Sequence, residues 1–424
     1  MSGIVIIGGG QAGVQLADSL RNEGYQGSID LFADESHLPY QRPPLSKDFM
    51  SDDDSAMPLP LRAGTFFTER TVQFHPGTRI LTVDRAQCTV TASDGRTVPY
   101  TSLVFATGAR NREMTIPGTD LNGIHYLRTL DDAKALQSAM AATTRVVVVG
   151  AGFIGLEFAA SARQRGLDVT VLEFAPRPMA RVLSPSMSAY FTEAHTGNGI
   201  NLRLGEGVSS FTEKDGKITG AVGTGGIEYP ADLVVIGVGV LPNTELAEQA
   251  GLEVNNGIVV DSCLRTADPH IFALGDCSNY PNIHTRSRLR LESVQNAIDQ
   301  ARALAKTLTG KPTPYENLPW FWSQQGSIKL QIAGIIGADD ETLVRGEPDT
   351  GKFSVYCFAD GQLTGVESVN SPAEHMAARR ILELGLGLTP EQVTDASFDL
   401  KGFSKQLPSR SDKKEHLEQP AAAL

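Results

Sequence analysis

Cysteine is scarce in this chain of 424 residues, and its four copies stand apart from one another. Cys88, Cys263, Cys277 and Cys357 form no C-x-x-C or C-x-x-x-x-C pair. A structural zinc ion or an iron–sulfur cluster needs clustered ligands, so no metal site is expected. We interpret the four cysteines as reduced, mostly buried thiols of a cytoplasmic protein.

Positive charge is also in deficit, because 37 Lys and Arg residues face 49 Asp and Glu residues. The formal net charge of -12 argues against a general affinity for nucleic acid or for anionic membranes, although it leaves room for a local basic patch. No uninterrupted apolar run reaches the ~20 residues that a membrane-spanning helix needs. Met1 leads straight into an apolar segment, with no basic region or cleavage site, which favours a cytoplasmic location. An H-E-x-x-H zinc motif and a recognisable hydrolytic Ser-His-Asp set are missing as well.

Glycine, by contrast, is abundant, and two glycine-rich turns of the same kind stand out. Residues 8–13 read Gly-Gly-Gly-Gln-Ala-Gly, and residues 150–155 read Gly-Ala-Gly-Phe-Ile-Gly. Each turn follows an apolar run, Ile4–Ile7 or Val146–Val149, and opens a segment with helical periodicity. One such turn alone also fits a nucleotide-free α/β unit. Two of them, each in a strand–turn–helix context, predict two bound dinucleotides and electron transfer between them.

Each glycine of these turns has a separate task. The first permits the tight turn, the second lets backbone N–H groups approach a pyrophosphate, and the third lets the helix pack on the strand. The pyrophosphate then lies at the positive end of the helix dipole. The candidate positions are Gly8, Gly10 and Gly13 in the first turn, and Gly150, Gly152 and Gly155 in the second.

An acidic residue follows each turn after a second apolar run. Asp34 or Glu35 in the first copy and Glu173 in the second are placed to accept hydrogen bonds from a ribose. A carboxylate at Glu173 repels a 2′-phosphate, so NADH is favoured over NADPH. Arg177 and Arg181 lie shortly after it, and either soften that preference or belong to a solvated loop.

The whole order of features is repeated along the chain. Each half carries a glycine turn, an acid, a hairpin and an apolar strand that ends in glycine, at Leu103–Gly108 and at 232–239. Such a length calls for two or three domains. Residues 320–405 contain strands and then helices, and they form a third unit. Beyond Leu407 the composition is polar and rich in Pro and Ala, which predicts disorder.

Longer motifs are more specific, and through them the chain resembles the ferredoxin-reductase-like flavoproteins, such as putidaredoxin reductase, rubredoxin reductase and the ferredoxin reductases of ring dioxygenases. The resemblance spans Val5 to about Phe403. Its motifs are Pro39-Tyr40-Gln41-Arg42-Pro43-Pro44-Leu45-Ser46-Lys47, Ala106-Thr107-Gly108-Ala109, Tyr126-Leu127-Arg128-Thr129, Gly275-Asp276-Cys277, Leu291-Glu292-Ser293-Val294-Gln295-Asn296-Ala297 and Pro319-Trp320-Phe321-Trp322-Ser323.

The resemblance implies an α/β fold with two Rossmann-like dinucleotide-binding domains of the glutathione-reductase type and a C-terminal α+β domain. FAD is expected on the first turn and NADH on the second. The implied division is 1–110 with 243–320 for FAD, 111–242 for NADH, 321–405 for the C-terminal domain, and 406–424 for a disordered tail.

The same resemblance implies roles for single residues. Those expected around FAD are Ala12, Asp34, Glu35, Arg42, Lys47, Ile80, Ala106, Thr107, Gly108, Arg128, Asp276 and Val294. Those expected around NADH are Gly152, Ile154, Glu173 and Gly239.

Two further positions carry expectations about catalysis. Lys47 and Glu157 correspond to a pair that similar proteins place near flavin N5, where it neutralises charge; an ordinary ion pair is the alternative. Phe153 stands where relatives often have an aromatic gate over the flavin, although an apolar core residue fits the sequence as well.

The missing cysteines decide between electron acceptors. Relatives that reduce disulfides or peroxide carry thiols near the flavin, whereas the stretch Arg42–Leu45 has none. We therefore expect single electrons to pass from FAD to a [2Fe–2S] ferredoxin that supplies an oxygenase of the haem-thiolate monooxygenase type. Arg286, Arg288 and Arg290 are candidates for docking that acidic partner, or are loop residues. Trp320 and Trp322 either line the electron path or belong to the core.

Several alternatives stay open. A dioxygenase-system ferredoxin reductase or a rubredoxin reductase fits the same motifs. So does an NADH oxidase without a protein partner. A signalling flavoprotein of the apoptosis-inducing-factor type calls for a basic surface or a targeting segment, and neither is visible in the sequence.

Overall fold

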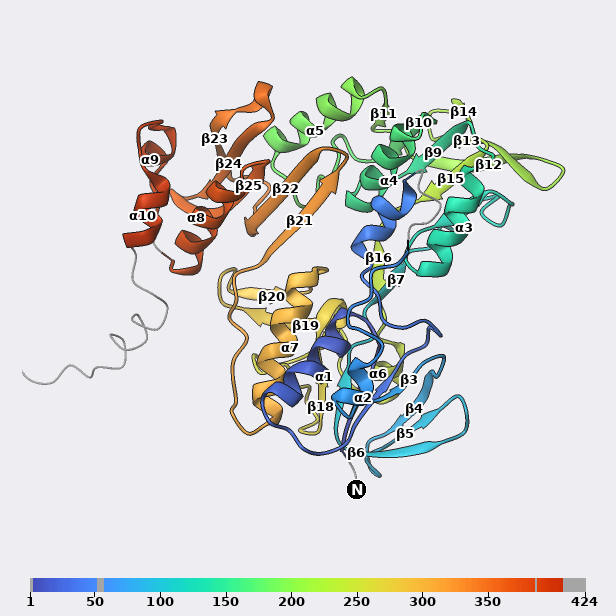
Figure 1. Cartoon of the computed structure of the whole chain (residues 1–424). Coiled ribbons are helices and arrows are strands. Elements are labelled where there is room, and N and C mark those ends of the chain that lie inside the picture. Colours follow the sequence, from blue (N-terminus) through green and yellow to red (C-terminus); the bar gives the residue numbers. More distant parts are fainter. Residues whose placement is uncertain (1–2, 52–56, 386, 407–424) are drawn as a thin grey trace, which may run out of the picture. The chain divides into compact units, whose positions relative to one another are not determined.

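The computed structural model describes residues 3–51, 57–385 and 387–406 (Figure 1). These residues form two compact units, one from the chain up to 176 together with 195–317, the other from 177–194 together with the chain from 318 on. The predicted tail at 406–424 falls outside the described residues except for its first position. Among the described helices, none is long and apolar enough to cross a bilayer.

The first sheet of the larger unit carries the first glycine turn. Its strand order is β3-β2-β1-β6-β5-β4, and β18 pairs with β6. Strands β2 and β18 run parallel to β1 and β6, whereas β4, β5 and β6 form an antiparallel meander. The bounds are β1 Gly3–Ile7, β2 Ile29–Phe32, β3 Gln73–His75, β4 Ile80–Asp84, β5 Thr89–Ala92, β6 Thr97–Phe105 and β18 Ile271–Ala273.

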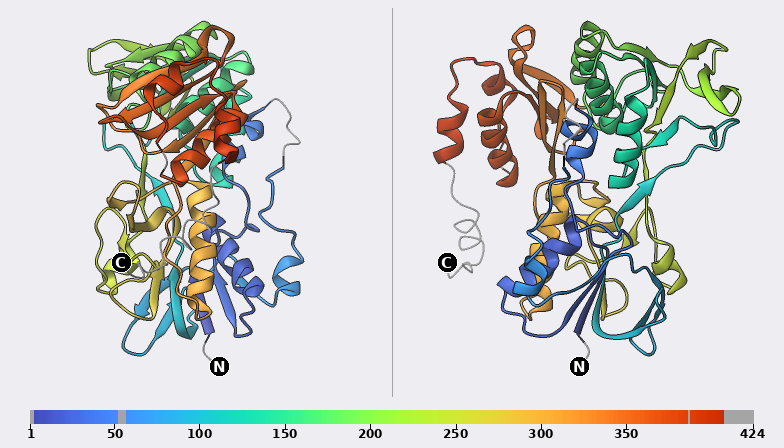
Figure 2. Two further views of the ribbon diagram at one scale, coloured as in Figure 1. Left: turned by 90° about the vertical axis from the view of Figure 1, so that its left-hand side faces the viewer. Right: turned by 45° about the vertical axis from the view of Figure 1, so that its right-hand side comes forward.

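Helices α1 (Gln11–Asn22) and α7 (Val294–Leu308) pack side by side on this sheet (Figures 1 and 2). Their apolar residues join those of β1, β2 and β6 in one core. The amphipathic pattern of α7 puts Ala297, Ala301 and Leu304 into that core. The sheet and its two helices therefore combine the N-terminal part of the chain with a later segment that contains β18 and α7.

The second sheet carries the second glycine turn and is entirely parallel, in the order β11-β10-β9-β15-β8. The run of valines in β9 is buried on both faces, as is typical of parallel sheets. Its elements are β8 Ile124–Tyr126, α3 Leu130–Met140, β9 Arg145–Val149, α4 Phe153–Gln164, β10 Asp168–Glu173, β11 Asn201–Leu204 and β15 Leu233–Ile236.

Smaller sheets complete the larger unit. An antiparallel sheet, β12-β13-β14, extends the second half, and β7 pairs with β16 where the chain passes between the halves. The bounds are β7 Ala109–Asn111, β12 Val208–Lys214, β13 Lys217–Gly223, β14 Glu228–Pro230, β16 Val240–Pro242, β17 Ile258–Val259, β19 Ser278–Asn282 and β20 Ser287–Leu289, with short helices α2 Phe66–Glu69 and α6 Glu245–Gln249.

The C-terminal unit is an antiparallel sheet in the order β21-β22-β25-β24-β23. Apolar residues of α8 pack on it around Tyr356 and Ala378. Its elements are β21 Trp320–Gln325, β22 Ile328–Gly334, β23 Glu341–Glu347, β24 Lys352–Ala359, β25 Gln362–Val369, α8 Pro372–Glu383, α9 Pro390–Thr394 and α10 Leu400–Gln406, and most of α5 (Pro185–Gly197) belongs to it. The predicted fold class, two Rossmann-like halves followed by an α+β domain, is confirmed.

Candidate functional site

The first glycine turn joins β1 to α1 and is shaped by close backbone contacts. A Cβ atom on Gly8, whose φ is +123°, would lie 2.1 Å from the carbonyl oxygen of Ala106. A Cβ atom on Gly13 would lie 2.0 Å from the carbonyl oxygen of Gly8. Gly10, the N-cap of α1, has nothing within 4 Å of its Cβ position. A side chain at Gly8 or Gly13 would clash with the backbone, whereas the Cβ position of Gly10 faces open space.

The second turn, between β9 and α4, has the same construction. A Cβ atom on Gly150, at φ +101°, would lie 2.6 Å from the carbonyl oxygen of Gly237, and one on Gly155 would lie 2.2 Å from that of Gly150. The nearest atom to a Cβ on Gly152 is 4.0 Å away. In the described part of the chain no side chain caps the N-terminus of α1 or α4. Both turns therefore offer N–H groups and open space that fit a pyrophosphate.

Glu173, the last residue of β10, holds the second turn in place. Its Oε2 accepts the N–H of Ala151 at 2.6 Å, and its Oε1 accepts that of Ala175 at 2.8 Å. The carboxylate is thereby fixed beside the turn, with lone pairs left for a ribose. Arg177 donates to the carbonyl oxygens of Ala180 and Leu183, so its guanidinium is engaged within its own loop.

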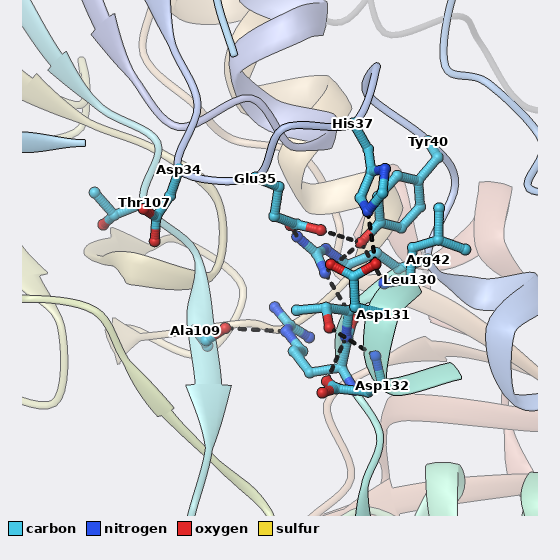
Figure 3. A network of polar contacts seen from close by, with 12 residues as sticks. Asp34, Glu35, His37, Tyr40, Arg42, Thr107, Ala109, Leu130, Asp131 and Asp132 are labelled. Carbon is cyan, nitrogen blue, oxygen red and sulfur yellow. Dashed lines mark hydrogen bonds and ion pairs between the residues drawn. The ribbon is translucent and has the colours of Figure 1, made fainter. Parts of the chain in front are cut away.

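The two candidate acids after β2 have different surroundings. Asp34 is largely exposed and pairs with Arg79, the residue before Ile80. Glu35 accepts hydrogen bonds from Arg42 and from the hydroxyl of Tyr40, both at 2.5 Å (Figure 3). Arg42, which was expected to face the cofactor, therefore pairs with Glu35, an acid that was also expected there.

Tyr40 and Arg42 also connect the first half to helix α3 of the second. The Tyr40 hydroxyl accepts the N–H of Leu130 at 2.8 Å, and Arg42 donates to the carbonyl oxygen of Arg128 at 2.6 Å (Figure 3). Burial raises the pKa of the Tyr40 phenol far above its usual value, so this hydroxyl stays protonated at neutral pH. Nothing in the sequence pattern assigned Tyr40 a role, although it lies within a motif.

Arg128 and Asp276 are brought together from distant parts of the chain. The Arg128 guanidinium is 3.1 Å from Asp276 Oδ2 and donates to the carbonyl oxygen of Ala109 at 2.9 Å. Asp276 lies in a short turn beside α7, which begins at Val294 and is capped by Ser293. Both expected cofactor residues therefore lie where the first sheet, α7 and the link to the second half meet.

A strap, defined here as Pro43–Met50, belongs in sequence to the first half but packs on α3 and α4. It consists of two 3₁₀ turns, and its side chains Leu45, Phe49 and Met50 are buried. Gln137 of α3 donates to the carbonyl oxygen of Phe49 at 3.1 Å. Prolines 43 and 44 fit this conformation because their fixed φ suits a tight helical turn.

The strap carries Lys47 to Glu157 of α4. Lys47 Nζ is 2.5 Å from Glu157 Oε2, and the two side chains are only 12% and 7% exposed. The same oxygen accepts the hydroxyl of Ser46 at 2.6 Å. A buried charge pair of this kind loses much hydration, and the extra hydrogen bond offsets part of that loss. No pattern in the sequence pointed to a role for Ser46.

The other expected residues lie at several places in the two halves. Thr107 donates from its hydroxyl to the carbonyl oxygen of Asn243 at 2.6 Å, so it fixes the crossing between the halves. Phe153 and Ile154 begin α4, and Ile154 is 38% exposed. Ala12, Ile80 and Ala106 are buried, while Gly108 and Gly239 adopt positive φ values.

Trp320 begins β21 in the C-terminal unit. The guanidinium of Arg379 lies 4.8 Å from its ring centroid, and the ring of His375 lies 5.8 Å away. Burial lowers the pKa of His375 to about 4, so its imidazole is neutral at pH 7. Trp322, two residues on, is more exposed.

The three arginines near α7, expected as a local positive cluster for docking, include two whose guanidinium groups also make contacts within the fold. Arg288 donates to the carbonyl oxygens of Val260 and Asn279 at 2.6 and 2.5 Å. Arg290 is 10% exposed, is 2.7 Å from Glu292, and donates to the carbonyl oxygen of Asp276. Arg286 and Arg288 are exposed and Arg290 is partly buried, so the docking of an acidic partner at these arginines stays a prediction.

The four cysteines are all free, and Cys277 and Cys357 are buried. Burial raises the pKa of both thiols, which disfavours the reactive thiolate. Within the described ranges, no group of three His, Cys, Asp or Glu side chains is arranged to hold a metal ion.

The comparisons with known proteins agree with this geometry. Residues 2–301 match the family model described as pyridine nucleotide-disulphide oxidoreductase, and residues 320–404 match the one described as reductase C-terminal. Rhodocoxin reductase of Rhodococcus erythropolis is 51% identical over 94% of this chain and 93% of its own length. Putidaredoxin reductase of Pseudomonas putida is 38% identical over 94% and 96%.

This chain belongs to the ferredoxin reductase family. Among solved structures, the ferredoxin reductase for the CYP199A2 system of Rhodopseudomonas palustris is similar, with a TM-score of 0.93, 46% identity, and coverage of 95% of this chain and 100% of the other. The reductase chain in the covalent putidaredoxin reductase–putidaredoxin complex gives 0.92, 37%, 96% and 99%.

Family membership confirms the resemblance drawn from the motifs. The chain is an oxidoreductase of the ferredoxin–NAD(P)+ reductase class, and the family implies FAD and a nicotinamide nucleotide. The prediction of an electron-transfer flavoenzyme is therefore confirmed at that level.

Proposed function

We propose that this ferredoxin reductase family member is an FAD-dependent NADH:ferredoxin oxidoreductase that supplies electrons to an oxygenase. The observation that carries this proposal is the pair of glycine turns, each with an open glycine position at Gly10 or Gly152 and a helix N-terminus that no side chain of the described residues caps. FAD is assigned to the first turn and NADH to the second. FAD held here would supply the capacity to take a hydride from NADH and to release electrons singly.

In this proposal, residues of the chain bind the two nucleotides, orient them and balance the charge beside the flavin. The N-terminus of α1 and the Arg128–Asp276 pair are proposed to hold the flavin nucleotide, and Lys47 with Glu157 is proposed to balance charge beside it. The remaining proposed FAD contacts are Gly8, Ala12, Gly13, Asp34, Glu35, Arg42, Ile80, Ala106, Thr107, Gly108 and Val294. The proposed NADH contacts are Gly150, Phe153, Ile154, Gly155, Glu173 and Gly239, and Trp320 is proposed on the electron path.

NADH is proposed over NADPH because of Glu173. Its carboxylate is fixed by the N–H groups of Ala151 and Ala175, so it cannot turn away from a 2′-phosphate without losing two hydrogen bonds. A phosphate next to this carboxylate would be repelled, whereas a ribose hydroxyl can donate to it.

A [2Fe–2S] ferredoxin is proposed as the acceptor for two reasons. In the described part of the chain the four cysteines are unpaired, and no thiol lies on the strap beside Lys47. The relatives named above are reductases of rhodocoxin and putidaredoxin, and one solved relative serves a CYP199A2 system. We propose an oxygenase of the haem-thiolate monooxygenase type as the final consumer of the electrons. The proposed location is the cytoplasm, where free thiols remain reduced.

The proposed domain division has 1–110 and 243–320 for FAD, 111–242 for NADH and 321–405 for the C-terminal domain, although residues 177–194 group with the C-terminal unit. The strap is the exception within the first range, because it packs on α3 and α4.

The test is to purify the full chain, record its visible spectrum, and compare NADH with NADPH in anaerobic stopped-flow reduction. A flavin spectrum and a clear preference for NADH support the proposal. A colourless protein that takes up no FAD, or a preference for NADPH, would overturn it.

A further inference from the structure

The hydroxyl and the carbonyl of Ser46 each make a hydrogen bond to helix α4. The hydroxyl donates to Glu157 Oε2 at 2.6 Å, and the carbonyl oxygen accepts the hydroxyl of Ser161 at 3.1 Å. Glu157 and Ser161 are one helical turn apart, so both lie on the face of α4 that meets the strap. Ser46 itself is 5% exposed.

The two bonds of Ser46 have different consequences. The bond from Ser161 joins backbone and hydroxyl, and it holds the strap against α4 without touching a charge. The bond to Glu157 joins a neutral donor to a buried carboxylate oxygen that also carries the Lys47 ammonium at 2.5 Å. Hydrogen bonds to charged groups are stronger than neutral ones, so this bond fixes the orientation of the carboxylate as well as the strap.

We propose that Ser46 is a positioning residue for the Lys47–Glu157 pair: its hydroxyl orients the Glu157 carboxylate so that Lys47 and Glu157 act together during reduction by NADH. The inference rests on the proposed function, because it assigns the pair a part in that step. The role assigned to Ser46 is exerted through Glu157 and does not require contact with either nucleotide.

The geometry of Oε2 explains why a second donor is useful. A lysine ammonium is a compact charge on a flexible stem and does not fix the plane of a carboxylate by itself. Lys47 Nζ also donates to the carbonyl oxygen of Pro43 at 2.9 Å, within its own strap. Ser46 and Lys47 are consecutive residues, so their donors reach the same oxygen from adjacent positions of the strap. Loss of the hydroxyl would remove the neutral donor to this oxygen and leave the Lys47 ammonium contact in place.

The experiment compares Ser46→Ala with a matched control, Ser161→Ala, in the full flavin-loaded chain. Each variant removes one hydroxyl that joins the strap to α4, but only Ser46→Ala removes a donor to the carboxylate. Stopped-flow reduction by NADH gives the limiting rate and the apparent NADH dissociation constant separately. Amide hydrogen exchange of residues 45–50 measures how firmly the strap is held.

We expect Ser46→Ala to lower the limiting rate by about tenfold, the order expected for a hydrogen bond to a charged group, with little change in the apparent NADH dissociation constant. Ser46→Cys, with its weak S–H donor, should fall between the wild type and Ser46→Ala. Ser161→Ala should speed exchange in the strap as much as Ser46→Ala does, yet keep the wild-type rate.

Equal losses of rate in Ser46→Ala and Ser161→Ala would reduce Ser46 to a strap anchor and overturn the inference. An unchanged limiting rate in Ser46→Ala would overturn it as well. If NADH fails to reduce the wild-type flavin at all, the proposed function is what fails, so the two failures are distinguishable.

Discussion

The Ala151 N–H donates to Glu173 Oε2 at 2.6 Å, so the acid at the end of β10 is bonded directly to the second glycine turn. This hydrogen bond holds the acid beside the second glycine turn before any nucleotide binds. Under the proposed function, the nucleotide preference would depend on a group whose position is set by the backbone.

Replacing Glu173 by Ala should change that preference. Without the carboxylate the repulsion of a 2′-phosphate disappears and a ribose loses its acceptor, so the ratio of kcat/KM for NADH to that for NADPH should fall by about tenfold or more. Asp168→Ala removes the same charge from the exposed start of β10 and should leave the ratio unchanged. A ratio that stays constant in Glu173→Ala would contradict the assignment of the second turn.

Breaking the Lys47–Glu157 pair should affect stability and rate in separable ways. Lys47→Met leaves a carboxylate buried without its cation, which costs about 3–5 kcal/mol for typical buried pairs. The double variant Lys47→Met/Glu157→Leu removes both charges and should recover most of the lost melting temperature. Flavin reduction by NADH should stay slow in both variants. Recovery of the rate in the double variant would mean that the pair is only structural.

The arginines near α7 should respond differently to charge reversal. Arg286→Glu should weaken ferredoxin reduction and spare NADH–ferricyanide activity, because Arg286 is exposed at the turn before β20. Arg290→Glu should damage both activities, since Arg290 supports the Asp276 carbonyl and pairs with Glu292. Parallel assays with the two acceptors separate these outcomes, and equal losses in Arg286→Glu would remove it from the docking surface.

The C-terminal unit contains a carboxyl that makes stability depend on pH. Glu367 is fully buried and bonded to Ser184, and burial raises its pKa to about 7 from an ordinary 4.5. The folded state therefore holds this proton more tightly than the unfolded state. Its contribution is complete below pH 4.5 and is lost as the pH rises through 7, a change of about 3 kcal/mol at 1.36 kcal/mol per unit.

Melting temperatures between pH 5 and pH 8 test this linkage. Glu367→Gln cannot ionise, so its melting temperature should fall less over that range than that of the wild type. Glu341→Gln, at an exposed position on β23 of the same sheet, should follow the wild type. Identical slopes in all three proteins would show that Glu367 does not titrate as described.

Much of the fold could be predicted because it depends on local sequence patterns. The glycines at 8, 13, 150 and 155 are required by backbone contacts within a few residues of each turn or with the adjacent strand, and that requirement is visible as a motif. The parallel strand of valines at Arg145–Val149 is likewise explicit in the sequence. Lys47 and Glu157 could be paired only because similar proteins place such residues together.

Other contacts have no local sign. Glu35 and Arg42 were each expected at the cofactor, and in the structure they bond to each other while the Tyr40 hydroxyl bonds the same carboxylate. Ser184 and Glu367 are 183 residues apart, and no periodicity links them. Arg290 belongs to a basic triplet in the sequence, yet the chain turns its guanidinium inward to the Asp276 carbonyl. Tertiary packing decides these positions.

The most direct test of the central claim is anaerobic reduction of a purified [2Fe–2S] ferredoxin by NADH and the flavin-loaded protein, followed by the cluster's visible absorption. The account predicts fast reduction that needs both NADH and this protein, and slow NADH oxidation in air when the ferredoxin is left out. A cluster that stays oxidised while NADH is consumed rapidly in air would contradict the account and identify an oxidase instead.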